Sequence, residues 1–203
     1  SALAGDATPV PNMVELAHAK EGSGTCGGGT TNVVYNLKTQ KVEKQFLSLV
    51  GTDRNCAGGP MPWGSWITCE EPADLTSERG LQHGYCFEVK ASDDGKLQRA
   101  TPLKGLGRFR HEAVVLDPKT GILYLTEDMS DGLLYRFIPE TKGDFTAGKL
   151  QALKISGRSS ADLRNYTASS KNLKEGREIK VTWIDLEDVE SPLNDLRHRG
   201  HKA

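Results

Sequence analysis

The stretch HEAVVLDPKTGILYLTEDMSDGLLYRFIPETKGDFTAGKLQALKI, residues 111–155, consists of short runs of β-forming residues separated by turn signals. The first two runs are joined by DPKTG at 117–121, and Gly-containing turns separate the later runs. Runs of this length with hairpin chemistry between them predict antiparallel strands. This segment therefore predicts four consecutive strands and an all-β protein.

A second stretch repeats this pattern. It comprises NCAGGPMPWGSWITCEE at 55–71 and HGYCFEVKASDDGKLQRATPL at 83–103. In the alignment of the two stretches, Ala57 falls on Ala113, and the KLQ of 96–98 falls on the KLQ of 149–151. Units of four strands in about 45–55 residues are typical of β-propeller blades. We predict a β-propeller with blade units at about 56–103 and 111–156.

The rest of the chain adds only part of the expected ring. Residues 27–50 contain two strands, which we assign to the outer half of an earlier blade, and 157–203 contain an irregular insertion, the strand EIKVTWIDL and a charged tail. Two blades and a half cannot close a propeller. We therefore predict one partial domain over 1–203, completed by blades from the rest of the polypeptide or from a companion fragment.

Composition excludes two classes of partner. The formal net charge of the 203 residues is −1, from 26 basic and 27 acidic side chains, which gives no attraction to nucleic acid. No apolar run approaches the roughly 20 residues of a membrane helix.

The four cysteines form no C-x-x-C pair, although Cys69 and Cys86 are expected on neighbouring strands.

The repeat places chemically reactive residues at equivalent positions of the two blades. Cys56 and Glu112 each begin a first strand, while Glu70-Glu71 and Glu127-Asp128 end the second strands. Because a second strand runs antiparallel to the first, its end lies beside the start of the first strand. Carboxylates crowded in this way repel one another unless cations bind. Oxygen ligands suit calcium, whereas a thiolate suits iron or zinc.

Other interpretations of these residues remain open. Acidic pairs at strand ends are commonly solvated, and a lone buried cysteine commonly acts as a small hydrophobic residue. Arginines near the expected cluster could hold phosphate in a bidentate way or could pair with the local carboxylates. These arginines are Arg54, Arg108 and Arg110.

The motifs NCAGGPMPWGSWITCEE, GRFRHEAVVLDPKTGILYLTEDMSDGLLYRFIP and VTWIDLEDVESP resemble the bacterial PhoX-type alkaline phosphatases and their uncharacterised relatives. The resemblance covers about residues 27–192. It implies a six-bladed propeller, Tat export to the periplasm or beyond, and an iron and calcium cluster that hydrolyses phosphate monoesters. Family members carry an Asn-His-Glu segment upstream, where this chain has only His18-Ala-Lys-Glu21.

The resemblance also implies roles for particular residues. Cys56 resembles the cysteine that ligates iron, Glu70 or Glu71 resembles the acidic ligand on the next strand, and Glu112 resembles a carboxylate of the metal centre. Further metal ligands implied by the motif are Glu127, Asp128 and Asp131.

Three hypotheses for function follow. The first is a metal-dependent phosphatase that acts on phosphate monoesters, with Glu112, Arg108 and Arg110 as catalytic residues and calcium and iron as cofactors. The second is a calcium-dependent propeller hydrolase of the lactonase or organophosphatase type, which would need no thiolate ligand. The third is a non-catalytic propeller whose metal only holds the blades together.

Overall fold

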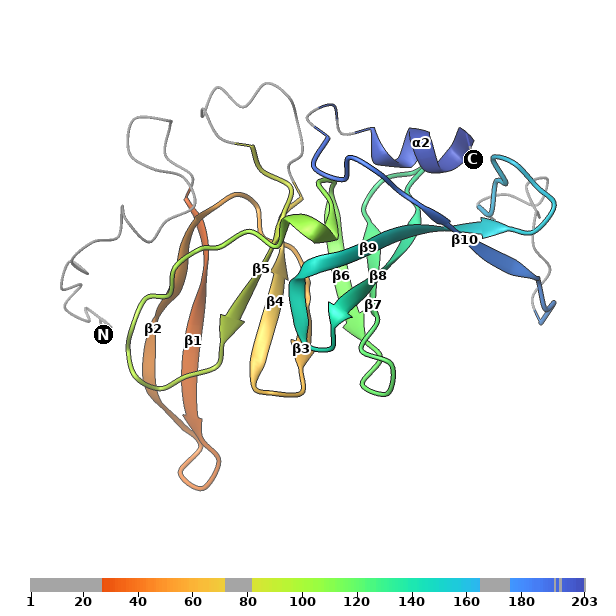
Figure 1. The fold of residues 1–203 in the computed structure, drawn as a ribbon. Coiled ribbons are helices and arrows are strands. Elements are labelled where there is room, and N and C mark those ends of the chain that lie inside the picture. Colours follow the sequence, from red (N-terminus) through yellow and green to blue (C-terminus); the bar gives the residue numbers. More distant parts are fainter. Residues whose placement is uncertain (1–26, 72–81, 165–175, 192, 194, 203) are drawn as a thin grey trace.

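The computed structural model describes residues 27–71, 82–164, 176–191, 193 and 195–202. These residues form ten strands, one short 3-10 helix and one α-helix (Figure 1). The elements are β1 (Gly28–Asn36), β2 (Lys41–Thr52), β3 (Gly59–Met61), β4 (Ser65–Cys69), β5 (Cys86–Lys90), η1 (Lys104–Leu106), β6 (His111–Leu116), β7 (Leu123–Glu127), β8 (Leu134–Thr141), β9 (Asp144–Ile155), β10 (Val181–Asp185) and α2 (Leu196–Lys202).

The strands form three antiparallel sheets. β1 and β2 make a hairpin, β3-β4-β5 make a three-stranded sheet, and β6 to β9 follow one another in a five-stranded sheet that β10 completes beside β9. Figure 1 shows the hairpin, the three-stranded sheet and the larger sheet arranged side by side. The tight turn between β6 and β7 is closed by Gly121, whose amide donates to the carbonyl of Asp117.

The first strands of the two larger sheets lie against each other. Gly58, immediately before β3, forms a parallel bridge with Ala113 of β6. Adjacent parallel first strands, each followed by an antiparallel meander, are the arrangement of neighbouring propeller blades. The sheets of the described residues do not close into a ring. The predicted fold class, all-β and part of a β-propeller, is therefore confirmed.

The hydrophobic core lies between these two sheets. Side chains of β4 and β5 meet those of β6 to β9, with Ile67, Leu125 and Phe137 fully buried. A smaller cluster joins Leu49 of β2 to Phe87 of β5, so the hairpin packs against the three-stranded sheet. Alternation of buried and exposed residues along β7 and β8 produces the inward face.

Two features differ in detail from the sequence interpretation. The expected fourth strand of the first unit is an extended segment, held by a bridge between Phe87 and Pro102 and by a bond from the Gln98 amide to the Ser48 carbonyl. The charged tail contains α2, whose Leu196 is buried in the main core. Arg197, the next residue of the helix, pairs with Glu127 at 3.6 Å, so an apolar contact and an ion pair together attach this short helix.

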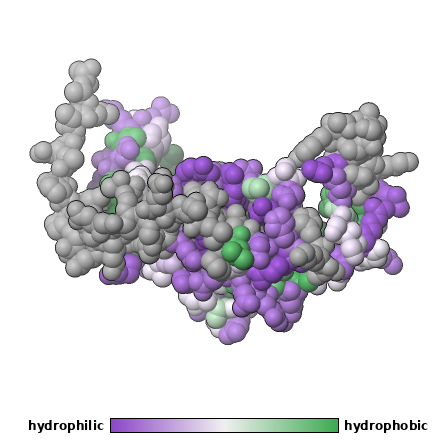
Figure 2. Space-filling model, turned by 90° about the horizontal axis from the view of Figure 1, so that it is seen from above, coloured by the Kyte–Doolittle hydropathy of each residue, from purple (hydrophilic) through white to green (hydrophobic). Residues whose placement is uncertain are grey.

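The surface agrees with the modest charge and hydropathy of the chain. In the face drawn in Figure 2, hydrophilic side chains predominate over the described residues, and hydrophobic ones occur in separate patches. Among the described residues, no helix has the length and apolar character needed to cross a membrane.

Candidate metal centre

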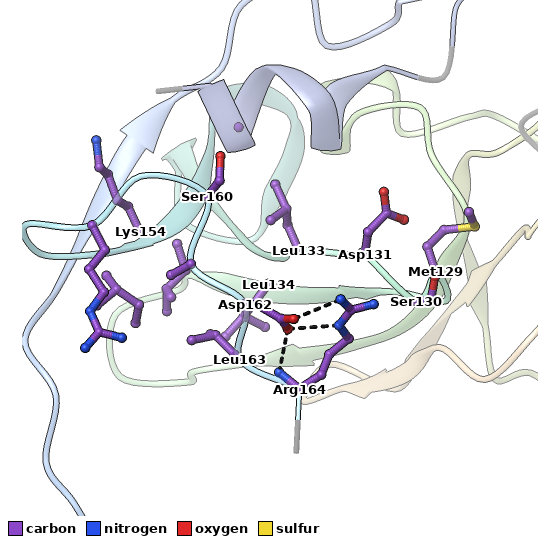
Figure 3. A pocket seen from close by; sticks show the side chains of 16 residues that line it. Met129, Ser130, Asp131, Leu133, Leu134, Lys154, Ser160, Asp162, Leu163 and Arg164 are labelled. Carbon is purple, nitrogen blue, oxygen red and sulfur yellow. Dashed lines mark hydrogen bonds and ion pairs between the residues drawn. The ribbon is translucent and has the colours of Figure 1, made fainter. Parts of the chain in front are cut away.

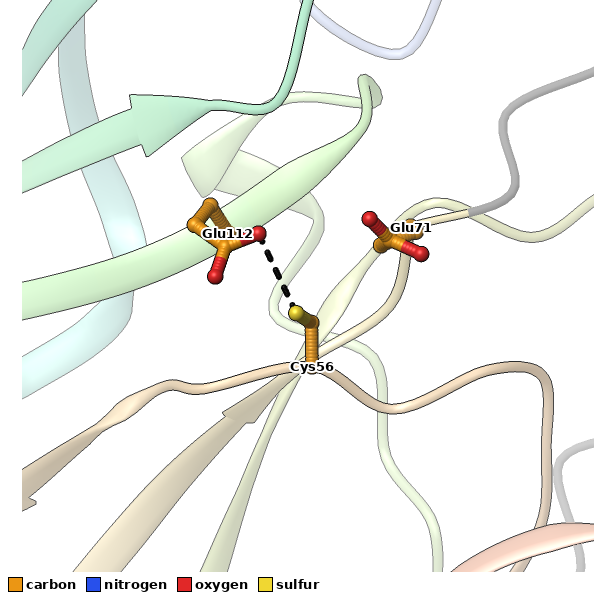
Figure 4. Close-up of side chains that lie close together, drawn as sticks. All are labelled: Cys56, Glu71 and Glu112. Atoms are coloured by element: carbon orange, nitrogen blue, oxygen red, sulfur yellow. Dashed lines mark hydrogen bonds between the residues drawn. The ribbon is translucent and has the colours of Figure 1, made fainter.

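Three of the predicted ligands converge. One ligand atom from each of Cys56, Glu71 and Glu112 lies within 4.8 Å of the other two (Figure 4). The three side chains come from three places in the sequence: the segment before β3, the second residue after the end of β4, and the second residue of β6. Each is only partly buried, so the cluster can be reached from solvent.

Backbone pairing explains this convergence. The Cys56 amide donates to the Cys69 carbonyl at 2.7 Å, which places Cys56 beside the end of β4. The Gly58 amide donates to the Glu112 carbonyl at 3.1 Å, which places the same segment beside the start of β6. The starts of two adjacent first strands and the end of a second strand therefore meet at one place, as the repeat predicts.

A local irregularity in β6 accompanies the third ligand. The pairing of β6 with β7 shifts between His111 and Val114, so that Glu112 and Ala113 form a bulge. Bulges redirect side chains and are common beside functional sites. The Ala113 amide is satisfied by the hydroxyl of Thr126 at 3.2 Å. Glu112 is thus displaced from the regular alternation of the strand, and its carboxylate lies next to Cys56.

The thiol and the carboxylate share a hydrogen bond. Cys56 Sγ donates to Glu112 Oε2 at 3.1 Å. This bond and, to a lesser extent, burial raise the pKa of the Cys56 thiol above its usual value of 9.0. The thiol is therefore protonated at neutral pH in the metal-free protein. A soft divalent ion would displace this proton, because only the thiolate is a metal ligand.

Two arginines balance the charge of the cluster. Glu71 pairs with Arg54 at 3.3 Å and with Arg110 at 3.4 Å. Arg110 also reaches Asp128 at 3.5 Å, so its guanidinium bridges two carboxylates. Arg54 has a side chain that is more than half exposed, whereas Arg110 is about one-third exposed. Both guanidinium groups therefore lie beside the cluster.

Glu70 lies outside this group. Its side chain is fully buried, and Oε1 accepts from the Asp53 amide at 2.9 Å and from His83 Nδ1 at 2.8 Å. Its Oε2 accepts from the amides of Gly84 and Tyr85 at 2.9 and 3.2 Å. All these donors surround the carboxylate, so the geometry favours Glu71 over Glu70 as the acidic ligand that follows Cys56.

The three acidic residues near the end of β7 are also outside the group. Glu127 accepts from the Tyr135 hydroxyl at 2.8 Å and pairs with Arg197 at 3.6 Å. Asp131 pairs with the same arginine at 3.3 Å. Asp128 is half exposed and pairs with Arg110, which also pairs with Glu71. Through this shared arginine Asp128 is linked to the cluster. Their role as metal ligands stays a prediction.

Arg108 occupies a different environment from Arg110. It is almost fully buried, and its guanidinium donates to the Ser191 carbonyl at 3.4 Å while its amide donates to the Val189 carbonyl. These contacts attach the segment before α2 to the residues between η1 and β6. The geometry therefore favours Arg110 over Arg108 as a phosphate-binding residue. The segment from His18 to Glu21 lies outside the described residues.

Two buried histidines contact residues near the cluster without belonging to it. His83 completes the shell of donors around Glu70, a role that the sequence interpretation did not assign. His83 lies three residues before β5, in a segment without a recognisable motif, so no signal in the sequence indicated this role. His111 stacks on Phe109 with ring centroids 3.6 Å apart, and its Nε2 lies 3.0 Å from the Gly107 carbonyl. Burial lowers the pKa of His111 to about 4, so the ring is neutral at physiological pH.

A separate cavity of about 590 Å³ lies between β8, β9 and the segment around Asp162 (Figure 3). Asp162 and Arg164 pair at 2.8 Å beside it. Of the predicted site residues, Asp131 lines this cavity, and none of the three clustered ligands does. We therefore place the candidate site at the thiol and the two carboxylates and not at this cavity.

Fold and site together define an all-β protein in which adjacent propeller-type sheets carry a cluster of one thiol and two carboxylates. The family described as alkaline phosphatase PhoX matches residues 26–201, and the chain therefore belongs to this family. The family suggested by the sequence motifs is thus confirmed.

One solved structure is similar, that of Pseudomonas fluorescens PhoX in complex with vanadate, a transition state analogue. The identity is 18% and the TM-score is 0.42. The match covers 66% of this chain and 33% of the solved chain, so the present chain corresponds to about a third of that protein's length. A comparison with curated proteins gave no match.

Proposed function

We propose that this chain is part of a metal-dependent phosphatase that hydrolyses phosphate monoesters, with a metal ion held by Cys56, Glu71 and Glu112. Membership of the PhoX alkaline phosphatase family supports the reaction class. The observation that carries the proposal is the convergence of these three ligand atoms within 4.8 Å. No other function class considered above requires a thiol in this position.

The donor set indicates which metal would bind. Two carboxylates alone would suit calcium or magnesium, but the thiolate of Cys56 selects a softer transition metal. We therefore propose iron at this site, with calcium bound by further oxygen ligands of the complete propeller. Bound metal would polarise the phosphoryl oxygens and stabilise the charge that develops during hydrolysis.

The residues of the chain have distinct roles in this proposal. Glu112 and Glu71 supply negative charge and orientation at the metal, while Arg110 and Arg54 provide guanidinium groups for phosphate oxygens. Planar guanidinium groups bind phosphate in a bidentate way. When phosphate arrives, Arg110 can exchange its long contacts with Glu71 and Asp128 for shorter bonds to the substrate. Family resemblance further suggests a periplasmic or secreted protein.

Elemental analysis of the purified chain tests the metal site. We expect iron in the wild-type protein and a loss of most of it in Cys56→Ser, because a hydroxyl is a far poorer ligand than a thiolate for this ion. Turnover of an aryl phosphate ester should be slow but metal-dependent, abolished by a chelator and restored by iron with calcium. Circular dichroism should show that Cys56→Ser keeps the β-sheet structure.

Glu140→Gln provides the matched control, since Glu140 is an exposed carboxylate at the end of β8, away from the cluster. It should keep the iron content of the wild type. Unchanged iron in Cys56→Ser would exclude Cys56 as a principal ligand. Retained metal without turnover of any phosphate ester would instead favour a non-catalytic, metal-binding propeller.

A further inference from the structure

Two cysteines outside the candidate metal centre face each other across neighbouring strands. The pairing of β4 with β5 places Cys69 directly opposite Cys86. Both side chains are fully buried, and their sulfur atoms lie 3.6 Å apart. Neither thiol is assigned a role in the metal centre, which uses Cys56.

The backbone bonds identify the type of cross-strand position. The Cys69 carbonyl accepts from the Cys56 amide, and the Cys86 carbonyl accepts from the Leu103 amide, so both carbonyls point away from the facing strand. The neighbouring bond runs from the Glu70 amide to the Tyr85 carbonyl. This is the non-hydrogen-bonded site of an antiparallel ladder, where opposite Cα atoms are about 4.5 Å apart and side chains approach most closely. That separation lies within the range of roughly 4.4–6.8 Å that disulfides span.

We propose that Cys69 and Cys86 are a site of covalent modification and form a disulfide that links β4 to β5. The two sulfur atoms need to approach by a fraction of the distance that now separates them, which rotation of the two side chains can supply. The alternative is a reduced pair that packs as two small hydrophobic residues. The direct cross-strand register distinguishes this pair from cysteines that are merely near each other in a core.

The chemistry requires an external disulfide as the oxidant. One cysteine thiolate attacks a sulfur of that disulfide, forming a mixed disulfide and releasing one thiolate. The second cysteine then attacks the mixed disulfide, so the Cys69–Cys86 bond forms and a second thiolate leaves. In total two protein thiols lose two electrons and two protons, and the external disulfide is reduced to two thiols.

Burial determines when this exchange can occur. In the folded chain both sulfurs are inaccessible, and burial raises the pKa of Cys86 well above its usual value. Little thiolate is therefore available once the core has packed. We expect the bond to form during folding, when β4 and β5 are already paired but still open to an oxidant.

The bond would constrain the strand that leads to the metal ligand. Cys69 ends β4, and Glu71 follows two residues later, so the bond would fix the point from which Glu71 projects. The two cysteines are separated by 17 positions, and a bond that closes such a loop restricts the unfolded chain. This consequence is structural and does not depend on which metal binds.

Oxidative refolding tests the proposal. The reduced, unfolded protein is refolded with a mixture of reduced and oxidised glutathione, with a chelator present, and in parallel with reductant alone. Free thiols are then alkylated, and the digest is mapped by mass spectrometry without reduction. We expect a peptide linked through Cys69 and Cys86 in most of the oxidised sample. Its thermal midpoint should exceed that of the reduced sample by at least about 5 °C.

Two variants give the controls. Cys56→Ser removes the cysteine of the metal centre and should keep the linked peptide. Cys69→Ala with Cys86→Ala should unfold at the same temperature in both buffers. If most molecules of the oxidised wild-type sample carry alkylated Cys69 and Cys86, or carry links to Cys26 or Cys56 instead, the proposal is wrong. The wild-type comparison requires no variant, so a variant that fails to fold does not prevent the test.

Discussion

Glu70 and Glu71 are neighbours in sequence but have opposite surroundings. Side chains alternate across a strand, so two adjacent residues at its end point in different directions. Glu70 enters a fully buried shell of donors, whereas Glu71 reaches the thiol cluster and two arginines. The first holds the loops around the site in place, and the second contributes to the site itself.

Glu70→Gln should therefore destabilise the fold more than it affects the metal. An amide of the same shape replaces one carboxylate oxygen with an NH₂ group, which would face either the Asp53 amide and His83 Nδ1 or the amides of Gly84 and Tyr85. Buried donors left unsatisfied cost about 1–3 kcal/mol each. We expect a loss of about 2–4 kcal/mol in urea unfolding, with the iron content per folded molecule unchanged. Loss of iron at full stability would instead identify Glu70 as a ligand.

Glu127 should make stability depend on pH. Burial is the main reason why its pKa is raised above 4.5, despite the bond from the Tyr135 hydroxyl. The folded protein thus holds this proton more tightly than the unfolded chain does. Stability should therefore fall as pH rises from about 4.5 through the raised pKa of the folded state.

In Glu127→Gln this decline should be absent, because the amide does not titrate but still accepts from Tyr135. Thermal midpoints of both proteins between about pH 4.5 and 7 would measure the difference. Parallel pH profiles for the two proteins would show that Glu127 does not titrate in this range.

At the scale of elements, the close approach of β3 and β6 assembles the site. A Cβ atom on Gly59 would lie 2.0 Å from the carbonyl oxygen of Val114 in β6. Any side chain at this position would force the two first strands apart. Because Cys56 precedes β3 and Glu112 belongs to β6, the same separation would move the thiol away from its carboxylate.

Gly59→Ala should consequently reduce both stability and metal binding. Overpacking of this kind costs about 1–3 kcal/mol. We expect a lower unfolding midpoint and an iron content below that of the wild type. Gly27→Ala is the control, since a Cβ at Gly27 meets no atom within 4 Å. Wild-type iron content in a destabilised Gly59→Ala protein would show that the strand contact and the site are independent.

At the scale of the whole molecule, the sheets of the described residues leave a propeller open. The three candidate ligands lie on or beside strands of two adjacent sheets. In a closed ring, further blades would supply ligands from the opposite side. We therefore propose that full activity requires ligands beyond the three in this cluster.

We expect the 203-residue chain to hydrolyse aryl phosphate esters at least about 100-fold more slowly than a longer chain with a closed ring, because transition-state charge would lack part of its stabilising groups. Steady-state assays of both proteins at equal iron content would measure this difference. Gel filtration with mass spectrometry would reveal any companion fragment. Equal rates for a monomeric species of 22.1 kDa would contradict the expectation.

The sequence by itself indicated the fold class, most of the strands and the family, because alternation and turn residues are local signals that need no knowledge of distant contacts. It also indicated Cys56, Glu112 and an acidic residue after β4, since the repeat relates the strands that carry them. Only the tertiary structure showed that Glu71, and not Glu70, joins the thiol cluster. It also showed that Arg110 pairs with Glu71, whereas Arg108 is almost fully buried. Direction and burial of a side chain depend on packing between sheets, as the bulge at Glu112 and the buried contact of Arg108 with Ser191 show.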